Sequence, residues 1–182
     1  MHTDILILAM LRERPHHGYE IKKAIDRSMA GMVSLNNKTL YLTLKRFEDA
    51  GAVTREVQLQ AGKPPRHIYH LTDRGVELLT AYLRDFGPEQ ARVDAEFFTR
   101  VSFFDFLEVP ERREILQQRL AYLEACMAYV RSLHQIAEDD EDYVRSIVLT
   151  PVHARRVLAF QTERIRDEVT WIRKWLAEMP AE

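Results

Sequence analysis

The chain has 182 residues, of which 46% are hydrophobic, and its formal net charge is −2. This length suits one large domain or two small ones, and the composition is that of an ordinary globular protein. The single cysteine, Cys126, excludes an intramolecular disulfide framework and favours a reducing compartment. The longest apolar run, residues 5–11, is far shorter than the roughly 20 residues of a membrane span, so we expect a cytoplasmic protein without a membrane partner.

The charge is divided unevenly between the two halves of the chain. Residues 1–87 carry 13 Lys and Arg against 10 Asp and Glu, whereas residues 88–182 carry 13 against 18. The first half is therefore slightly basic and the second half acidic. This asymmetry favours an anionic partner for the first half.

Three helices are predicted at the start of the chain. Pro15 and the "HHG" after it separate a helix over about 3–13 from a second one, in which apolar residues recur every four positions from Ile21. The third helix covers about 37–50, where Asn36 stands at the N-cap and Gly51 follows the last turn.

A β-hairpin and a fourth helix are predicted next. Residues 53–60 alternate in polarity, and the turn residues "AGKPPR" separate them from a second β-rich run at 67–71. Thr72 then caps a helix that ends before Gly87 and Pro88. The order of helix, helix, helix, strand, strand, helix is that of a winged helix-turn-helix, so we expect a mainly α fold with a small β-hairpin.

The second half predicts long amphipathic helices over about 110–137 and 150–179, separated by the acidic run "EDDED". We therefore divide the chain into a winged helix-turn-helix domain at 1–87 and an α-helical domain at 88–182. The long helices carry more apolar surface than this half can cover alone, which predicts a two-fold dimer. The expected dimer contacts are Leu116, Leu120, Leu123, Met127, Leu158, Ile165, Val169, Ile172 and Leu176.

The third helix carries the candidate DNA contacts. In winged helices the N-terminal turn of this helix meets base edges, so Asn37, Lys38 and Thr39 are expected to face bases, with Asn36 shared between capping and contact. Phosphate contacts are expected from Thr43, Lys45 and Arg46. The hairpin tip, from Lys63 to Arg66, adds cations that could reach a minor groove or a row of phosphates.

Three motifs in this region resemble one family of regulators. "HGYEI" (17–21), "TLYLTLKRFEDAGAV" (39–53) and "RHIYHLTDRG" (66–75) are similar to the PadR family of bacterial winged-helix transcription regulators. The resemblance implies that Lys38, Thr39 and Tyr41 lie on the DNA face, with the Tyr41 hydroxyl on a phosphate. It also implies a repressor that is released from DNA by an effector signal.

If the protein is a two-fold dimer, its DNA site should have the matching two-fold symmetry. Two copies would read a palindromic operator whose half-sites lie about 34 Å apart, one turn of DNA. Candidate walls of an effector pocket are aromatic: Phe97, Phe98, Trp171 and Trp175. Aromatic residues at helical spacing are, however, more often part of a core or a dimer interface.

Other functions have weaker support in the sequence. His67 and His70 lie three apart on a predicted strand and point to opposite faces, so we expect no metal. No GxSxG, P-loop, HExxH or GxGxxG motif occurs, so we expect neither an enzyme nor a cofactor. The alternative to DNA binding is a winged helix that binds protein, which would need apolar anchors on helix 37–50.

Overall fold

The computed structural model describes residues 1–28, 35–60, 63–139 and 152–180. They form two compact units, Met1–Glu108 and Val109–Glu182, and each unit is described here by itself. The predicted helix start at Thr150-Pro151 and most of the acidic run 138–142 lie outside the described residues. The predicted fold class is confirmed, because the described chain is mainly helical with one small antiparallel sheet.

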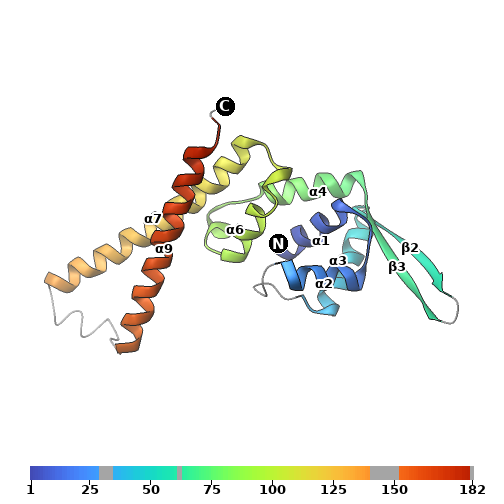
Figure 1. Cartoon of the computed structure of the whole chain (residues 1–182), viewed down its shortest axis with the longest axis horizontal. Coiled ribbons are helices and arrows are strands. Elements are labelled where there is room, and N and C mark those ends of the chain that lie inside the picture. The colour runs from blue at the N-terminus through green and yellow to red at the C-terminus, as the bar shows by residue number, and fades with distance from the viewer. Residues whose placement is uncertain (29–34, 61–62, 140–151, 181–182) are drawn as a thin grey trace. The chain divides into compact units, whose positions relative to one another are not determined.

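The first unit is built around its first helix, α1 (His2–Glu13) (Figure 1). Its apolar run gives consecutive buried side chains from Ile5 to Ala9, each at most 2% exposed. A helix that is apolar on every side must be covered on every side. Here α1 packs against α2 (Gly18–Ser28), the sheet, α4 (Asp73–Arg84) and α6 (Asp94–Val101).

The third helix, α3 (Asn37–Asp49), begins and ends where the sequence predicts. The Asn36 side chain accepts a hydrogen bond from the Thr39 backbone N–H at 2.8 Å, which satisfies one of the free donors of the first turn. Gly51 has φ +70°, a left-handed conformation that costs glycine nothing and that turns the chain directly into a strand. Both predicted helix signals are confirmed.

The sheet has three antiparallel strands in the order β1-β3-β2. The hairpin of β2 (Val53–Gln60) and β3 (Lys63–Leu71) extends away from the helices of its unit (Figure 1). The second strand begins earlier than predicted, because the prolines are accommodated within the strand. β1 (His16–His17) was not predicted, and it pairs with Tyr69 and Ile68 of β3.

The start of α4 is locked onto the turn after α3. Thr72 caps the helix by accepting from the Gly75 N–H at 3.1 Å, while its own hydroxyl donates to the Gly51 carbonyl at 2.7 Å. The Thr72 N–H also donates to the Ala52 carbonyl at 3.1 Å. These bonds join the base of the hairpin to both flanking helices.

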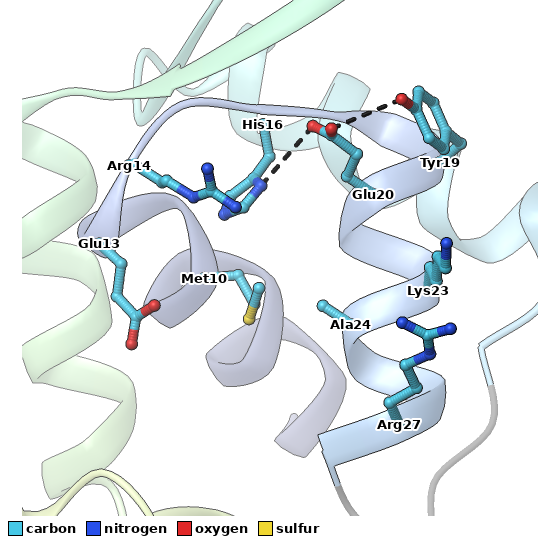
Figure 2. A pocket seen from close by; sticks show the side chains of 9 residues that line it. All are labelled: Met10, Glu13, Arg14, His16, Tyr19, Glu20, Lys23, Ala24 and Arg27. Atoms are coloured by element: carbon cyan, nitrogen blue, oxygen red, sulfur yellow. Dashed lines mark hydrogen bonds and ion pairs between the residues drawn. The ribbon is translucent and has the colours of Figure 1, made fainter.

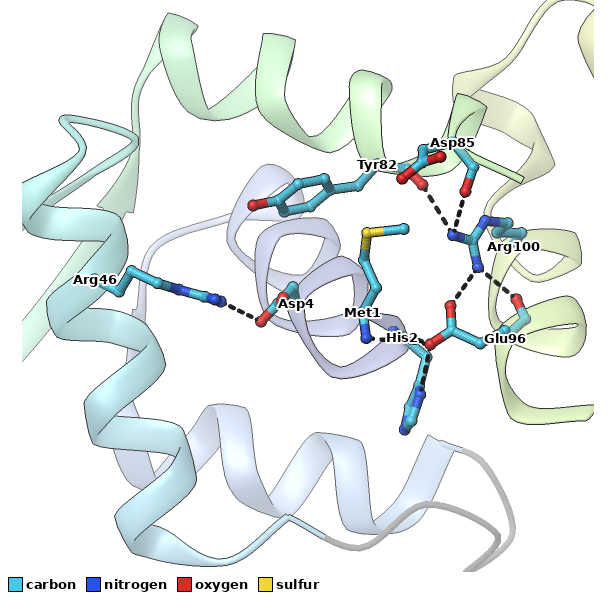
Figure 3. Close-up of polar contacts among 8 residues, drawn as sticks. All are labelled: Met1, His2, Asp4, Arg46, Tyr82, Asp85, Glu96 and Arg100. Carbon is cyan, nitrogen blue, oxygen red and sulfur yellow. Dashed lines mark hydrogen bonds and ion pairs between the residues drawn. The ribbon is translucent and has the colours of Figure 1, made fainter. Parts of the chain in front are cut away.

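The first unit extends 21 residues beyond the predicted boundary at 87/88, through α5 (Pro88–Ala91), α6 and the short helix η1 (Phe104–Phe106). A buried ion cluster explains this difference (Figure 3). Arg100 is fully buried and donates to the Glu96 carboxylate at 2.6 Å and to the carbonyls of Tyr82 and Asp85 at 3.2 and 2.8 Å. Glu96 in turn accepts from the His2 backbone N–H at 2.9 Å, so α6 is bound to both α1 and α4.

The second unit consists of α7 (Val109–Asp139) and α9 (Val152–Glu178), which pack against each other. Its buried core includes Leu116, Leu123, Val169 and Ile172. A salt bridge also crosses it, because Arg119, only 2% exposed, donates to the two oxygens of Glu168 at 2.7 and 3.0 Å. None of the helices in the described ranges is both long and apolar enough to cross a membrane.

Candidate nucleic-acid interface

The exposed N-terminal end of α3 carries the predicted base contacts. Asn36, Asn37, Lys38 and Thr39 are all exposed, whereas Leu40 and Leu44 of the same helix are fully buried. Lys38 forms no ion pair with another residue of the described chain. A free cation, two amides and a hydroxyl therefore project from one helix end, which is suited to donor and acceptor groups at base edges.

Tyr41 lies one turn further along α3 and is 48% exposed. Its ring stands against Gly18 at the start of α2, so closely that a Cβ on Gly18 would lie 2.8 Å from Tyr41 Cε1. The missing side chain of Gly18 thus makes room for this ring. Leu42 next to it is 59% exposed, an apolar surface on this helix that the sequence analysis overlooked.

Thr43 requires a correction. It was expected on the exposed side of α3 as a phosphate contact, but it is only 8% exposed and belongs to the buried face of the helix. The helix is amphipathic with a wide buried stripe, and position 43 falls three residues after Leu40 and one before Leu44, within that stripe. A buried threonine cannot contact DNA in this conformation.

Lys45 and Arg46 are exposed as expected, but both have acidic partners. Lys45 Nζ lies 3.6 Å from Asp49 one turn later, and both side chains are well exposed. Arg46 donates to the Asp4 carboxylate of α1 at 2.6 Å (Figure 3). Arg46 therefore fastens α3 to α1, and its availability to a phosphate is lower than the sequence suggests.

Around the predicted contact Arg66, the wing base and the start of α2 add three residues that were not predicted as contacts: His17, Tyr19 and His67. The Arg66 guanidinium lies over the Tyr19 ring, 5.9 Å from its centroid. The His17 ring stacks on the same Tyr19 ring, with 5.8 Å between the ring centroids. His17 Nδ1 lies 3.0 Å from the His67 carbonyl of β3, which joins the start of α2 to the wing. The motif "HGYEI" contained the signal, because a glycine lets another group approach its backbone closely.

These residues form one cleft between α2, α3 and β3. Its walls are His17, Gly18, Tyr19, Tyr41, Pro65, Arg66, His67 and Tyr69. Tyr69 is buried, and the loss of solvent raises the pKa of its hydroxyl. Lys63 begins β3, but its side chain lies outside the described part of the structure, so the predicted contact from the wing tip rests on Arg66.

The proposed effector residues fall into separate units. Phe97 is fully buried in the first unit, where its ring packs against Phe86 at 6.2 Å and Phe98 at 5.2 Å. In the second unit, the ring centroids of Trp171 and Trp175 of α9 lie 5.2 Å apart. Phe97 thus serves as a core residue of its unit, which is the more common role for such aromatic residues.

The expected dimer contacts divide by burial into three groups, of which the partly exposed group is Leu120, Met127, Ile165 and Leu176. Leu116, Leu123, Val169 and Ile172 are buried inside the single chain, so they cannot meet a second copy without opening the helix pair. Leu158 is 45% exposed. Among the residues of this unit whose burial the structure describes, the large apolar side chains that face solvent in the single chain are Tyr129, Val157, Leu158, Phe160 and Trp171.

Across the described residues, no group of three His, Cys, Asp or Glu side chains could hold a metal ion. The site instead consists of a capped helix with an exposed polar N-terminal end, a supporting helix whose start meets it, and an antiparallel hairpin with a cation beside it. Such an arrangement defines a winged helix-turn-helix domain, the class in which the third helix enters the major groove of DNA.

Comparison with known proteins finds a family match for this domain. Residues 7–81 match the transcriptional regulator PadR-like family. The chain is 27% identical to the negative transcriptional regulator PadR of Bacillus subtilis over 94% of this chain and 93% of that protein. A probable transcriptional regulator of Mycobacterium tuberculosis is 29% identical over 43% of this chain and 42% of that protein.

Among solved structures, a crystal structure of Bacillus subtilis PadR in complex with operator DNA is similar to this chain, with 23% identity and a TM-score of 0.45. The similarity covers 97% of this chain and 98% of that one.

Proposed function

We propose that this protein is a sequence-specific DNA-binding transcriptional regulator, a repressor that acts in the cytoplasm without enzymatic chemistry. The observation that carries the proposal is the exposed end of α3, where Asn37, Lys38 and Thr39 project together beside Tyr41. The similarity to a negative transcriptional regulator over nearly the whole chain supports the sign of the regulation.

The contacts divide by their chemistry into two kinds. Asn37, Lys38 and Thr39 meet base edges from the N-terminal turn of α3. Tyr41, Arg66 and Tyr19 line the cleft beside that turn, where hydroxyls and a guanidinium suit the phosphate backbone. The ion pair between Lys45 and Asp49 is exposed and therefore weak. Lys45 can break this pair and contact a phosphate instead.

Tight binding at physiological salt requires more phosphate contacts than one such domain provides. We therefore propose a two-fold dimer on a palindromic operator, with half-sites about 34 Å apart. Its contacts come from the exposed apolar side chains of the second unit, in particular Leu158, Phe160 and Trp171. An effector that changes the spacing of the two domains would release the DNA.

A second candidate function is supported by one specific observation. Tyr41 and Leu42 are exposed apolar side chains on α3, and a helix that binds protein would offer such anchors. The same two side chains also suit DNA, because an apolar group can contact the thymine methyl. DNA is the better reading, since the exposed polar residues Asn37, Lys38 and Thr39 lie one turn before them on the same helix.

Footprinting on the DNA upstream of the protein's own gene tests the proposal, with Lys38→Ala and Arg66→Ala as variants and Lys174→Ala of α9 as the matched control. We expect palindromic protection that weakens with salt. Each of the two variants should lose affinity for DNA. Where a variant loses a phosphate contact, the slope of log affinity against log salt concentration should fall in magnitude by about one. Equal binding to random DNA by all four proteins, also in a genome-wide selection of fragments, would refute DNA recognition and favour a protein partner.

A further inference from the structure

A hollow of about 350 Å³ lies between α1 and α2 (Figure 2). The α1 side contributes Met10 and Arg14, the α2 side contributes Lys23 and Arg27, and His16 of β1 enters between the two helices. None of these five residues is used by the DNA interface described above. The hollow combines an apolar wall with several nitrogen donors.

His16 is the unusual member of this group. It is only 5% exposed, and neither ring nitrogen has a hydrogen-bond partner within the described structure. Its nearest acidic neighbour is Glu20, whose Oε2 lies 3.8 Å from Nδ1, beyond hydrogen-bond distance. A buried polar group without a partner costs about 1–3 kcal/mol, and native proteins rarely leave one unsatisfied.

The position of His16 is fixed by the backbone. Its strand pairs with Tyr69 of β3, so the ring is held in the hollow by the same ladder that fixes the wing. Glu20 is not free to turn toward it, because its carboxylate accepts a hydrogen bond from the His17 backbone N–H at 3.0 Å. That bond also lowers the pKa of Glu20, which therefore stays ionised and engaged.

The cations around His16 are also without close partners. Arg14, Lys23 and Arg27 are exposed, and in the described ranges none of them lies within 4.0 Å of a carboxylate. The acids on the rim are Glu13 and the engaged Glu20, so the lining has more positive than negative side chains. Lys23 and Arg27 lie one turn apart on α2 and line the same hollow as the buried imidazole, so together they attract negative charge.

We propose that this hollow binds a small organic anion, whose carboxylate or phosphate oxygen accepts a hydrogen bond from His16. Lys23 and Arg27 neutralise the charge of the anion, and Arg14 closes the opening beside His16. Met10 contacts the apolar part of the ligand. The site goes beyond the proposed function and does not depend on it, so binding can be measured in the absence of DNA.

The test is an NMR titration of the full-length chain at constant pH and ionic strength, with inorganic phosphate and acetate as probes and chloride as the blank. The chain has seven histidines, and the imidazole signal of His16 is identified by its loss in His16→Leu. We expect a saturable shift of the His16 signal with at least one probe. The apparent Kd should rise at least tenfold in Lys23→Gln/Arg27→Gln and remain unchanged in Lys174→Gln.

Three results would overturn the proposal. The first is a shift no larger than that caused by chloride, which would mean ionic screening only. The second is an equal shift in Lys23→Gln/Arg27→Gln, which would exclude these cations as ligands. The third is a His16 signal that responds to duplex DNA but to neither probe at tens of millimolar, because the hollow would then belong to the DNA interface. Since Lys23 and Arg27 are exposed, their replacement leaves folding intact.

Discussion

Gly18 and Tyr41 compete for the same space, because a Cβ on the glycine would lie 2.8 Å from Cε1 and 3.1 Å from the hydroxyl of the tyrosine. The absence of one side chain on α2 therefore sets the position of another on α3. The tyrosine ring is about half exposed and can move without disturbing the core. The geometry of the DNA-binding face thus depends on a buried residue that has no side chain.

Gly18→Ala should consequently separate binding from stability. We expect the free energy of unfolding to change by no more than about 1 kcal/mol, since alanine favours a helix more than glycine does. Affinity for operator DNA should fall by about tenfold or more as Tyr41 is displaced. Urea denaturation and a gel-shift titration measure the two effects. Tyr41→Phe is the control: if its affinity loss is absent while that of Gly18→Ala is present, the hydroxyl is not the contact.

Gly75→Ala should instead damage the fold. The added Cβ would lie 2.2 Å from the Ala52 carbonyl oxygen and 2.5 Å from Leu71 Cδ1, and that carbonyl is held by the Thr72 N–H. We expect a loss of about 2 kcal/mol or more in urea denaturation. Gly87→Ala is the comparison, because its Cβ would meet nothing closer than Gln90 Oε1 at 3.4 Å. Equal losses in the two variants would show that the junction can relax.

Because of Glu96, the stability of the first unit should depend on pH. Burial alone would raise the pKa of Glu96, but hydrogen bonds from Arg100, the His2 backbone N–H and the His2 ring outweigh it and lower the pKa to about 2 from the ordinary 4.5. Because the folded pKa is depressed, this stabilisation is complete above about pH 4.5 and is lost as the pH falls toward 2. The loss is at most about 3 kcal/mol.

Urea denaturation at pH 5, 4 and 3 measures this effect. Glu96→Gln should be less stable than the natural chain at pH 5, and the difference should shrink at pH 3. The control is Glu178→Gln, which replaces an exposed carboxylate at the end of α9. The free energy of unfolding of this variant should change with pH in parallel with that of the natural chain. A constant difference between Glu96→Gln and the natural chain at all three values would show that ionisation of Glu96 does not stabilise the fold.

Two ion pairs between α7 and α9 should differ widely in strength. Glu168→Gln leaves the guanidinium of Arg119 buried without its charged partner, which should cost about 3–5 kcal/mol. Glu124→Gln breaks an equally short bond to Arg173, at 2.7 Å, but that pair is exposed and should cost less than about 1 kcal/mol. Thermal unfolding compares the two. Equal effects would mean that burial does not decide the strength of these pairs.

The local signals in the sequence predict the DNA-binding unit well. Asn36 and Thr72 each cap a helix by accepting a bond from the backbone N–H three positions later, and Gly51 acts through its own φ angle. A short stretch of sequence therefore contains the cause of these helix boundaries. β1 was missed because two residues show no alternation. Its partner is more than 50 residues away, and only the folded chain brings His16 beside Tyr69.

The second half was harder to predict for a different reason. An apolar stripe on α7 has the same spacing whether its partner is α9 of the same chain or a helix of another copy. Leu116 and Leu123 fit either role in the sequence, and only the structure assigns them to the inside of the chain. The boundary at residue 87/88 missed Glu96 and Arg100, because ions that pair across the fold look like surface charges in a sequence.

The central position of α1 has a consequence for how the protein folds. Its apolar residues are covered by α4 and α6, elements that lie about 70 to 100 positions later in the chain. During synthesis the first helix therefore emerges with its apolar surface uncovered and must wait for those segments to leave the ribosome. Early contacts within α1 and α2 cannot complete the core, so the rate of folding should be set by closure of this long loop.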